Sequence, residues 1–385
     1  MLIKKLIFTF CVIIVLSIGI IVCTKYNPVE PKTDKLAKVD TRKSINYTDQ
    51  GIILDYEMPT YQAYYYNYDP TLDSWALIKN PGSYQCTYTV KFRIIDPCNN
   101  NYEIDSKSIT VPPNSSKGIF LQGDFSSSII SGFFTSIIEL RSGSGQLLDS
   151  KTLPNAFSAF RRTERFSNLN DYSIANSYIP EYGPYCPSYD PTGENWGYDS
   201  ANAEIIFNEF LQLSIPYNQQ TTRKGGAVDG NEAIRYTYGL FKANIKIDTR
   251  NTDHVLGAFW LSEPGCANAI NIEIYKQHGI ANAYTIDCHT YVGSSLRYQQ
   301  LHNINDLNFQ NNYYEYDIEW YTNHIRFYFG GLCIAETWGS NNVPSGTARL
   351  SPRYCLRMVP NPGPHCPPPL PSGNDATFMV SDAAY

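Results

Sequence analysis

The sequence predicts an all-β protein that follows a single N-terminal membrane helix, and three observations support this prediction. Short apolar runs with alternating polar residues recur between turn-rich segments, and no long amphipathic helix stands out. Aromatic residues make up 14% of the chain, with 31 Tyr and 18 Phe. Such residues favour strands because their side chains pack well on a pleated surface. The length of 385 residues allows two domains.

The composition argues against a nucleic-acid-binding protein and against a disordered protein. The 30 Lys and Arg residues against 36 Asp and Glu residues give a net charge of −6, and no basic run that would favour nucleic acid appears in the body of the chain. A chain with this many aromatic residues and only 17% charged residues is not disordered. The Tyr-rich composition suits contact with an uncharged, hydrogen-bonding partner, or it reflects only the strand propensity of tyrosine.

Residues 1–24 have the pattern of a signal anchor or a signal peptide. Lys4 and Lys5 precede a run from Leu6 to Cys23 without a charge, which is long enough to span a bilayer as a helix. No cleavage site of small residues follows the run, so we favour an uncleaved anchor over a cleaved signal peptide. Residues 25–44 are polar with scattered Lys and Pro, which indicates a linker.

The cysteines and two glycosylation sequons favour an extracytoplasmic protein, either membrane-anchored or secreted. Eight cysteines lie outside the N-terminal run, and an even number fits disulfides in an exported chain. Cys86 with Cys98 and Cys355 with Cys366 are plausible short-range pairs. The sequence contains no CxxC pair, so it does not predict a zinc module. The sequons begin at Asn46 and Asn114.

Residues 45–158 predict a small β-sandwich of immunoglobulin-like size. Strand-like runs at 87–95, 119–121 and 134–140 alternate with turn-rich segments at 96–101 and 112–116. The segment contains no catalytic constellation. We expect an accessory or spacer domain, with carbohydrate binding as the alternative.

Residues 165–385 predict a second and larger β domain. Apolar strand-like runs lie at 204–207, 210–215, 239–247 and 325–329. A span of this length made of strands and turns favours one large sandwich or barrel.

One pair of predicted strands carries the functional information. The first covers 255–261 and the second covers 269–275. Because side chains alternate across a strand, Ile270, Ile272 and Ile274 share one apolar face, and residues 269, 271 and 273 share the other. The polar face should therefore open onto a cleft, where a glutamate such as Glu273 suits acid–base chemistry.

These segments resemble glycoside hydrolase family 16, the concanavalin-like β-jelly-roll enzymes that include laminarinases and lichenases. The resemblance covers nearly all of residues 190–385. It rests on the order and spacing of the segments 200–205, 210–213, 232–241, 255–261, 268–275, 313–320 and 376–381. Family members carry Glu-x-Asp-x-Glu on the central strand, where the first Glu is the nucleophile, the Asp tunes the pair and the last Glu is the general acid/base.

The sequence departs from the family at two of these three positions. Ala269 stands at the nucleophile position and Asn271 at the middle position, while Glu273 keeps the acid/base position. Retaining glycosidases need two carboxyl groups about 5–5.5 Å apart, one of which attacks the sugar. Alanine cannot attack, so the resemblance implies a polysaccharide-binding protein that is catalytically inactive.

Two alternatives stay open. The first is an active glycoside hydrolase or transglycosylase in which Glu273 works with a non-standard carboxylate such as Glu232 or Asp287. The second is a structural surface protein that uses the jelly roll only as a scaffold.

The predicted partner is a neutral polysaccharide such as a β-glucan, since aromatic rings stack on sugars and amides bind hydroxyls. We expect Trp320 and Phe259 in the core. Family members often carry a structural calcium ion, but its ligands are not recognisable here, and we predict no other cofactor. The predicted substrate-binding residues are Trp196, Glu232, Arg235, Trp260, Asn271, Tyr275 and His289, and Tyr291 could also line the groove.

Overall fold

The computed structural model describes residues 50–60, 63–65, 71–125, 130–178, 196–217, 223–249, 254–277, 283–305, 308–359 and 375–385. The predicted signal anchor, the linker and the sequon at Asn46 lie outside these residues. Within them, no helix is long and apolar enough to cross a membrane.

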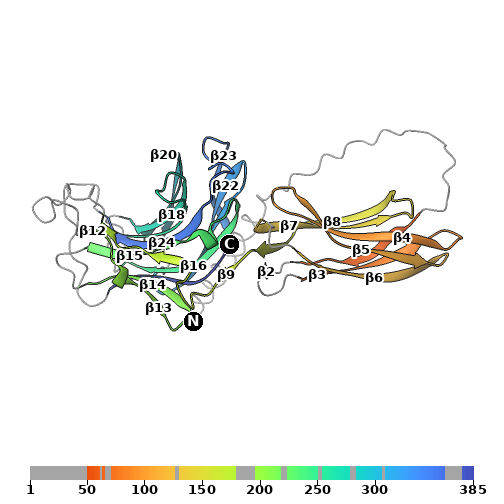
Figure 1. The fold of residues 1–385 in the computed structure, drawn as a ribbon, viewed down its shortest axis with the longest axis horizontal. Helices are drawn as coiled ribbons and strands as arrows, with labels where there is room; N and C mark the ends of the chain where they lie inside the picture. Colours follow the sequence, from red (N-terminus) through yellow and green to blue (C-terminus); the bar gives the residue numbers. More distant parts are fainter. Residues whose placement is uncertain are drawn as a thin grey trace, which may run out of the picture. The chain divides into compact units, whose positions relative to one another are not determined.

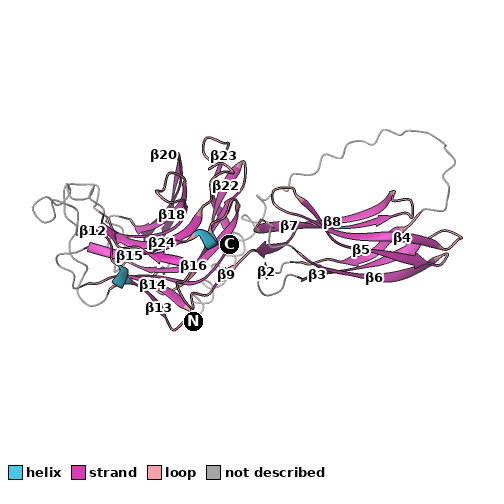
Figure 2. Ribbon diagram, viewed as in Figure 1, coloured by secondary structure: helices cyan, strands magenta, loops and turns pink. Residues whose placement is uncertain are grey.

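The described residues confirm the all-β prediction (Figure 2). Residues 52–160 form two sheets (Figure 1). The three-stranded sheet has the order β1-β3-β6, and the five-stranded sheet has the order β2-β8-β7-β4-β5. Their strands are β1 (Ile52–Glu57), β2 (Ala63–Tyr65), β3 (Thr71–Asn80), β4 (Cys86–Ile95), β5 (Asn101–Val111), β6 (Ser115–Asp124), β7 (Gly132–Arg141) and β8 (Leu147–Phe160).

The two sheets enclose one hydrophobic core, as a sandwich requires. Fully buried side chains from β3, β4 and β7, such as Ile78, Phe92 and Phe134, belong to the same cluster. The predicted strands at 87–95, 119–121 and 134–140 are confirmed as parts of β4, β6 and β7. The domain boundaries that we place at 45–158 and 165–385 stay a prediction.

The predicted Cys86–Cys98 disulfide is wrong, because the structure has no bond between the two sulfur atoms. Cys86 begins β4, and Cys98 lies in the turn after its last residue, Ile95. An extended strand rises about 3.3 Å per residue, so the Cα atoms at the two ends of β4 lie roughly 30 Å apart. A disulfide needs Cα atoms within about 7 Å. Cys366, the predicted partner of Cys355, lies outside the described residues.

Residues 163–384 form two larger sheets (Figure 1). The first has nine strands among the described residues, in the order β11-β12-β15-β24-β17-β18-β19-β20, with β10 also paired to β15. The bounds are β10 (Tyr172–Ile174), β11 (Ser177–Tyr178), β12 (Trp196–Tyr198), β15 (Arg223–Gly230), β17 (Val255–Ser262), β18 (Ala269–Lys276), β19 (Ala283–Val292), β20 (Ser295–Asn305) and β24 (Ser351–Met358).

The second large sheet has eight strands among the described residues, in the order β13-β14-β25-β16-β21-β22-β23, with β9 paired to β25. The bounds are β9 (Thr163–Glu164), β13 (Ala203–Ile206), β14 (Phe210–Ile215), β16 (Gly239–Asp248), β21 (Tyr314–Trp320), β22 (His324–Phe329), β23 (Leu332–Trp338) and β25 (Ala376–Ala384). Where the structure describes the chain, two short 3-10 helices, η2 (Ser200–Asn202) and η3 (Glu232–Ile234), connect strands. The strand predicted at 204–207 ends at Ile206, because Phe207 turns the chain with φ of 55° and is exposed.

The main core lies between these two sheets. It joins Leu213 and Phe378 of the eight-stranded sheet to Phe259 and Ile272 of the nine-stranded sheet. The predicted core positions of Phe259 and Trp320 are confirmed, since both are fully buried. The predicted isoleucine face is also confirmed, because Ile270, Ile272 and Ile274 are 0% exposed and belong to this core. The opposite face of β18 is therefore turned away from the core.

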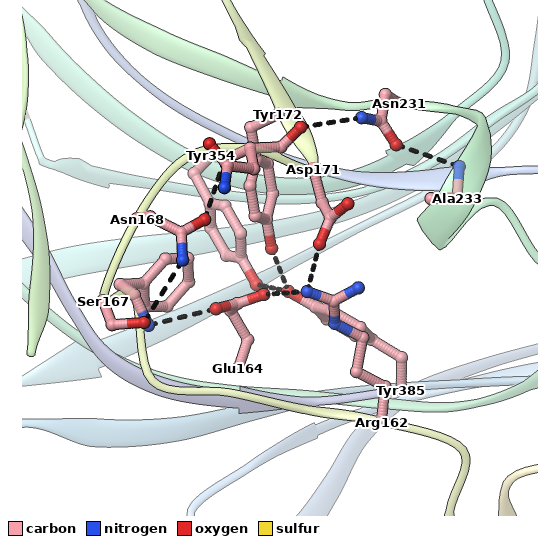
Figure 3. Close-up of polar contacts among 12 residues, drawn as sticks. Arg162, Glu164, Ser167, Asn168, Asp171, Tyr172, Asn231, Ala233, Tyr354 and Tyr385 are labelled. Atoms are coloured by element: carbon pink, nitrogen blue, oxygen red, sulfur yellow. Dashed lines mark hydrogen bonds and ion pairs between the residues drawn. The ribbon is translucent and has the colours of Figure 1, made fainter. Parts of the chain in front are cut away.

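A buried cluster of tyrosines connects β10 and β24 to residue 385 (Figure 3). The Tyr385 hydroxyl lies 2.7 Å from the Tyr172 hydroxyl and 2.9 Å from the Tyr354 hydroxyl. Arg162 donates to Glu164 and to Asp171 beside them. Because buried hydroxyls need partners, this mutual pairing lets three tyrosines fill the core without unpaired oxygen atoms.

Candidate functional site

Three neighbouring strands present the residues of the predicted motif on the face of the nine-stranded sheet that is turned away from the core. In the ladder between β18 and β19, Asn271 lies opposite His289 and Glu273 opposite Asp287, while Ala269 lies opposite Tyr291. Residues directly opposite on antiparallel strands point to the same face with Cβ atoms about 4.5–5.5 Å apart. The register therefore gathers these side chains in one place.

On the other side of β18, the strand β17 contributes Trp260. Trp260 pairs with Asn271 of β18, and it pairs with Arg353 of β24 on its second edge. The Arg353 and Arg357 guanidinium carbons lie 5.0 and 5.7 Å from the centre of the Trp260 ring, within the range of a cation–π interaction. These contacts fix the indole at the edge of the site.

The side chains enclose a groove with a cavity volume of about 350 Å³, within the range of small-molecule sites. The lining mixes aromatic, amide, carboxylate and guanidinium groups. It consists of Trp260, Gly265, Cys266, Ala269, Asn271, Glu273, His289, Tyr291, Ser294 and Arg357. The predicted site residues Trp260, Asn271, Glu273 and His289 thus come together in one groove.

Glu273 is the acidic residue of the groove lining. Burial raises the pKa of its carboxyl above the usual value, the His289 and Arg357 charges oppose that rise, and Asp287 adds to it. A glutamic acid with a raised pKa holds its proton at higher pH, which is the property a general acid needs. Burial is the main cause of this effect, and the neighbouring carboxylate of Asp287 on β19 adds to it.

Asp287 and His289 form a buried polar pair under the groove. Asp287 is 6% exposed and His289 is 5% exposed. Gln299 of β20 donates to Asp287 Oδ2 at 2.7 Å, and the Asn271 amide nitrogen lies 2.9 Å from His289 Nε2. Asp287 Oδ1 and His289 Nδ1 face each other at 3.4 Å, and neither atom has a hydrogen-bond partner among the described residues.

The remaining predicted residues lie in other places. Tyr275 packs against the small cluster of Tyr198, Leu256 and Cys355 beside the groove, and burial raises its pKa to about 12. Glu232 and Arg235 pair with each other at η3, and neither is among the residues that line the groove. Trp196 begins β12, and its side chain lies outside the description.

The sequence patterns did not point to four residues of the groove lining. Gly265, Cys266, Ser294 and Arg357 line it, although no motif marks them. Asp287, which sequence analysis considered only as a substitute carboxylate, lies under the groove beside His289. The available signal was the alternation of Asp287, His289 and Tyr291 along one strand, which places all three on one face.

A comparison with a family model tests the resemblance seen in the sequence. Residues 193–349 match the model of glycosyl hydrolases family 16. The resemblance is therefore confirmed for this part of the chain, which contains Ala269, Asn271 and Glu273. A comparison with curated proteins finds no match.

Several solved structures are similar to the chain. The β-glucanase of Bacillus licheniformis is 15% identical with a TM-score of 0.44, and the match covers 58% of this chain and 96% of that one. A Bacteroides ovatus family 16 protein, solved with a G4G4G3G product of mixed-linkage glucan, is 16% identical with a TM-score of 0.45, covering 58% and 98%. The endo-β-1,3-glucanase of Pyrococcus furiosus is 15% identical with a TM-score of 0.45, covering 58% and 92%.

The groove carries one carboxylate, that of Glu273, in its lining among the described residues. Ala269 is 2% exposed and contributes only a methyl group to the lining. Asp287 is close to Glu273, with ligand atoms of the two within 4.8 Å.

Glu273→Gln should stabilise the fold at neutral pH in metal-free buffer. A carboxyl group whose pKa is raised in the folded state favours folding at low pH and opposes it once the pH rises through the folded pKa. Glutamine does not titrate and keeps the shape of the side chain. Urea unfolding of both proteins at pH 4 and pH 7 should show the variant gaining stability relative to the original protein as the pH rises. If the difference in stability between the two proteins is the same at both pH values, the raised pKa of the partly buried Glu273 is contradicted.

Proposed function

We propose that the groove binds a neutral polysaccharide of the β-glucan type and does not hydrolyse it by double displacement. The single observation that supports the proposal is the composition of the groove within the segment that matches the family 16 model. Aromatic and polar groups line it, and Ala269 stands where the sequence resemblance places the nucleophile. Aromatic rings at Trp260 and Tyr291 suit sugar C–H faces, and Asn271, Ser294 and Arg357 suit hydroxyl groups.

An active enzyme that pairs Glu273 with Asp287 is the less supported alternative. Asp287 is not among the residues that line the groove, and its Oδ2 atom is held by Gln299. A carboxylate that attacks a sugar or activates a water must reach the bound substrate. Glu232, the other alternative partner, pairs with Arg235 and Arg349 outside the groove lining.

We further propose an extracytoplasmic location with residues 6–23 as the anchor. The support is the uncharged length of that segment and the sequon at Asn114, which is exposed in the turn between β5 and β6. The thiols of the described residues give this location no support, since none of them forms a disulfide.

The function is tested by retention of the full chain on immobilised β-1,3-glucan and mixed-linkage glucan, with galactan and chitin as comparison ligands. We expect retention on at least one glucan and elution by soluble glucan of the same linkage. Absence of retention on all four polysaccharides would favour the scaffold alternative.

A further inference from the structure

The buried pair under the groove has the properties of a metal site. Glu273, Asp287 and His289 each offer one ligand atom, and the three atoms lie within 4.8 Å of one another. For three atoms at most 4.8 Å apart, there is a central point no more than about 2.8 Å from each of them. A zinc–ligand bond is about 2.0–2.2 Å long, so an ion at that point would be slightly too far from its ligands. Small side-chain movements would close that difference. The three residues also come from two adjacent strands, so the backbone fixes their separation.

Two atoms of the pair that form no hydrogen bond point to a missing ligand. Asp287 Oδ1 and His289 Nδ1 have no hydrogen-bond partner among the described residues, although both residues are more than nine-tenths buried. Buried polar atoms without partners are unusual and costly. Their separation of 3.4 Å equals the spacing of about 3.4 Å between two ligands of one tetrahedral zinc ion. A cation between them would satisfy both atoms at once.

The neighbouring residues supply the outer contacts that metal ligands need. A metal-bound histidine usually donates its second ring N–H to an acceptor. The Asn271 amide lies 2.9 Å from His289 Nε2, and its Oδ1 atom has no partner among the described residues. A half-turn of the amide would place that oxygen to accept the Nε2–H. Gln299 already holds Asp287 Oδ2, which leaves Oδ1 directed at His289.

We propose that Glu273, Asp287 and His289 bind one divalent transition-metal ion, with Zn²⁺ as the best match. Two carboxylates and one imidazole are a normal zinc ligand set, and the imidazole disfavours Mg²⁺ and Ca²⁺. Arg357 also lines the groove and opposes a cation electrostatically, while the two carboxylates outweigh its single charge. Glu273 lines the groove, so the ion would present its open position to the polysaccharide or to water.

The metal site goes beyond the proposed glycan binding and is testable without any glycan. The metal-stripped full chain is titrated with ZnCl₂ by calorimetry, and bound zinc is counted by mass spectrometry after dialysis. We expect His289→Gln and Asp287→Asn each to hold one zinc ion fewer than the original protein, and zinc to raise the melting temperature of the original protein more than that of either variant. Asn271→Leu should weaken zinc affinity about 10- to 100-fold by removing the outer contact.

Two controls keep the result decisive. His302→Gln removes an imidazole from β20 outside this cluster and should leave the zinc count unchanged. If the variants of buried residues fail to fold, Glu273→Gln, which sits in the groove lining, replaces them. Equal zinc counts in the original protein and in Glu273→Gln, His289→Gln and Asp287→Asn would overturn the proposal, as would the absence of zinc binding in the original protein.

Discussion

Trp260→Ala should weaken polysaccharide binding by at least about tenfold, or about 1.4 kcal/mol. Trp260 forms a wall of the groove, and its ring lies next to the guanidinium groups of Arg353 and Arg357. The substitution removes the aromatic surface and also the contact that orders Arg357 in the lining. Truncated tryptophans at the centre of binding sites commonly cost about 2 kcal/mol or more. Affinity electrophoresis of the full chain in gels that contain glucan measures the change.

Trp338→Ala is the matched control for Trp260→Ala. Trp338 lies on β23 of the other large sheet, is 50% exposed and contacts His324 and Arg326. It is not among the residues that line the groove. We expect its loss to leave glucan mobility unchanged. Equal effects from the two substitutions would contradict the assignment of the groove as the binding site.

Trp320→Ala should destabilise the fold by about 3–5 kcal/mol, the usual cost of truncating a fully buried aromatic side chain. Trp320 is 0% exposed, packs edge-on against Tyr238 with ring centres 5.0 Å apart, and donates from its indole nitrogen to Pro344 O. Truncation leaves a cavity that the rigid sheets around it cannot fill, and it leaves Pro344 O without this donor.

Trp338→Ala is also the control for Trp320→Ala, because it compares an exposed tryptophan with a buried one. Trp338→Ala should change the free energy of unfolding far less, because half of its side chain is already in water. Urea unfolding midpoints of the three proteins measure both effects. A similar loss from the two substitutions would contradict the core position of Trp320.

Alternation within one strand was enough to predict the core face and the groove face of β18. Ile270, Ile272 and Ile274 pack in the core, and Ala269, Asn271 and Glu273 line the groove. The reason is that side chains in a strand alternate with a period of two, so one apolar set determines the direction of the other. Trp320 and Phe259 were also predicted to lie in the core, and both are fully buried.

The partners of β18 could not be predicted in the same way. Which strand lies beside another, and in what register, depends on contacts between residues far apart in the chain. The ladder that sets Glu273 opposite Asp287 and Asn271 opposite His289 is of this kind. The sequence therefore suggested Asp287 and Glu232 equally as partners of Glu273, while the structure brings only Asp287 next to it.

The Cys86–Cys98 prediction failed for a reason that was present in the sequence. Residues 87–95 were predicted as a strand, and an extended strand between two cysteines prevents their bonding. Closeness along the chain brings residues together only where the chain turns. The turn at Asp96, whose carboxylate accepts from the Cys98 and Asn100 backbone N–H groups, begins after the strand has already carried the chain away from Cys86.

The most direct test of a glucan-binding groove without double displacement is the release of reducing ends from a glucan that the full chain retains. Loss of a catalytic nucleophile commonly lowers turnover by about 10⁴- to 10⁶-fold, so we expect no release above a buffer blank and no difference between the original protein and Glu273→Gln. Binding with measurable release that disappears in Glu273→Gln would contradict the account, because it would show that Ala269 at the nucleophile position does not prevent catalysis.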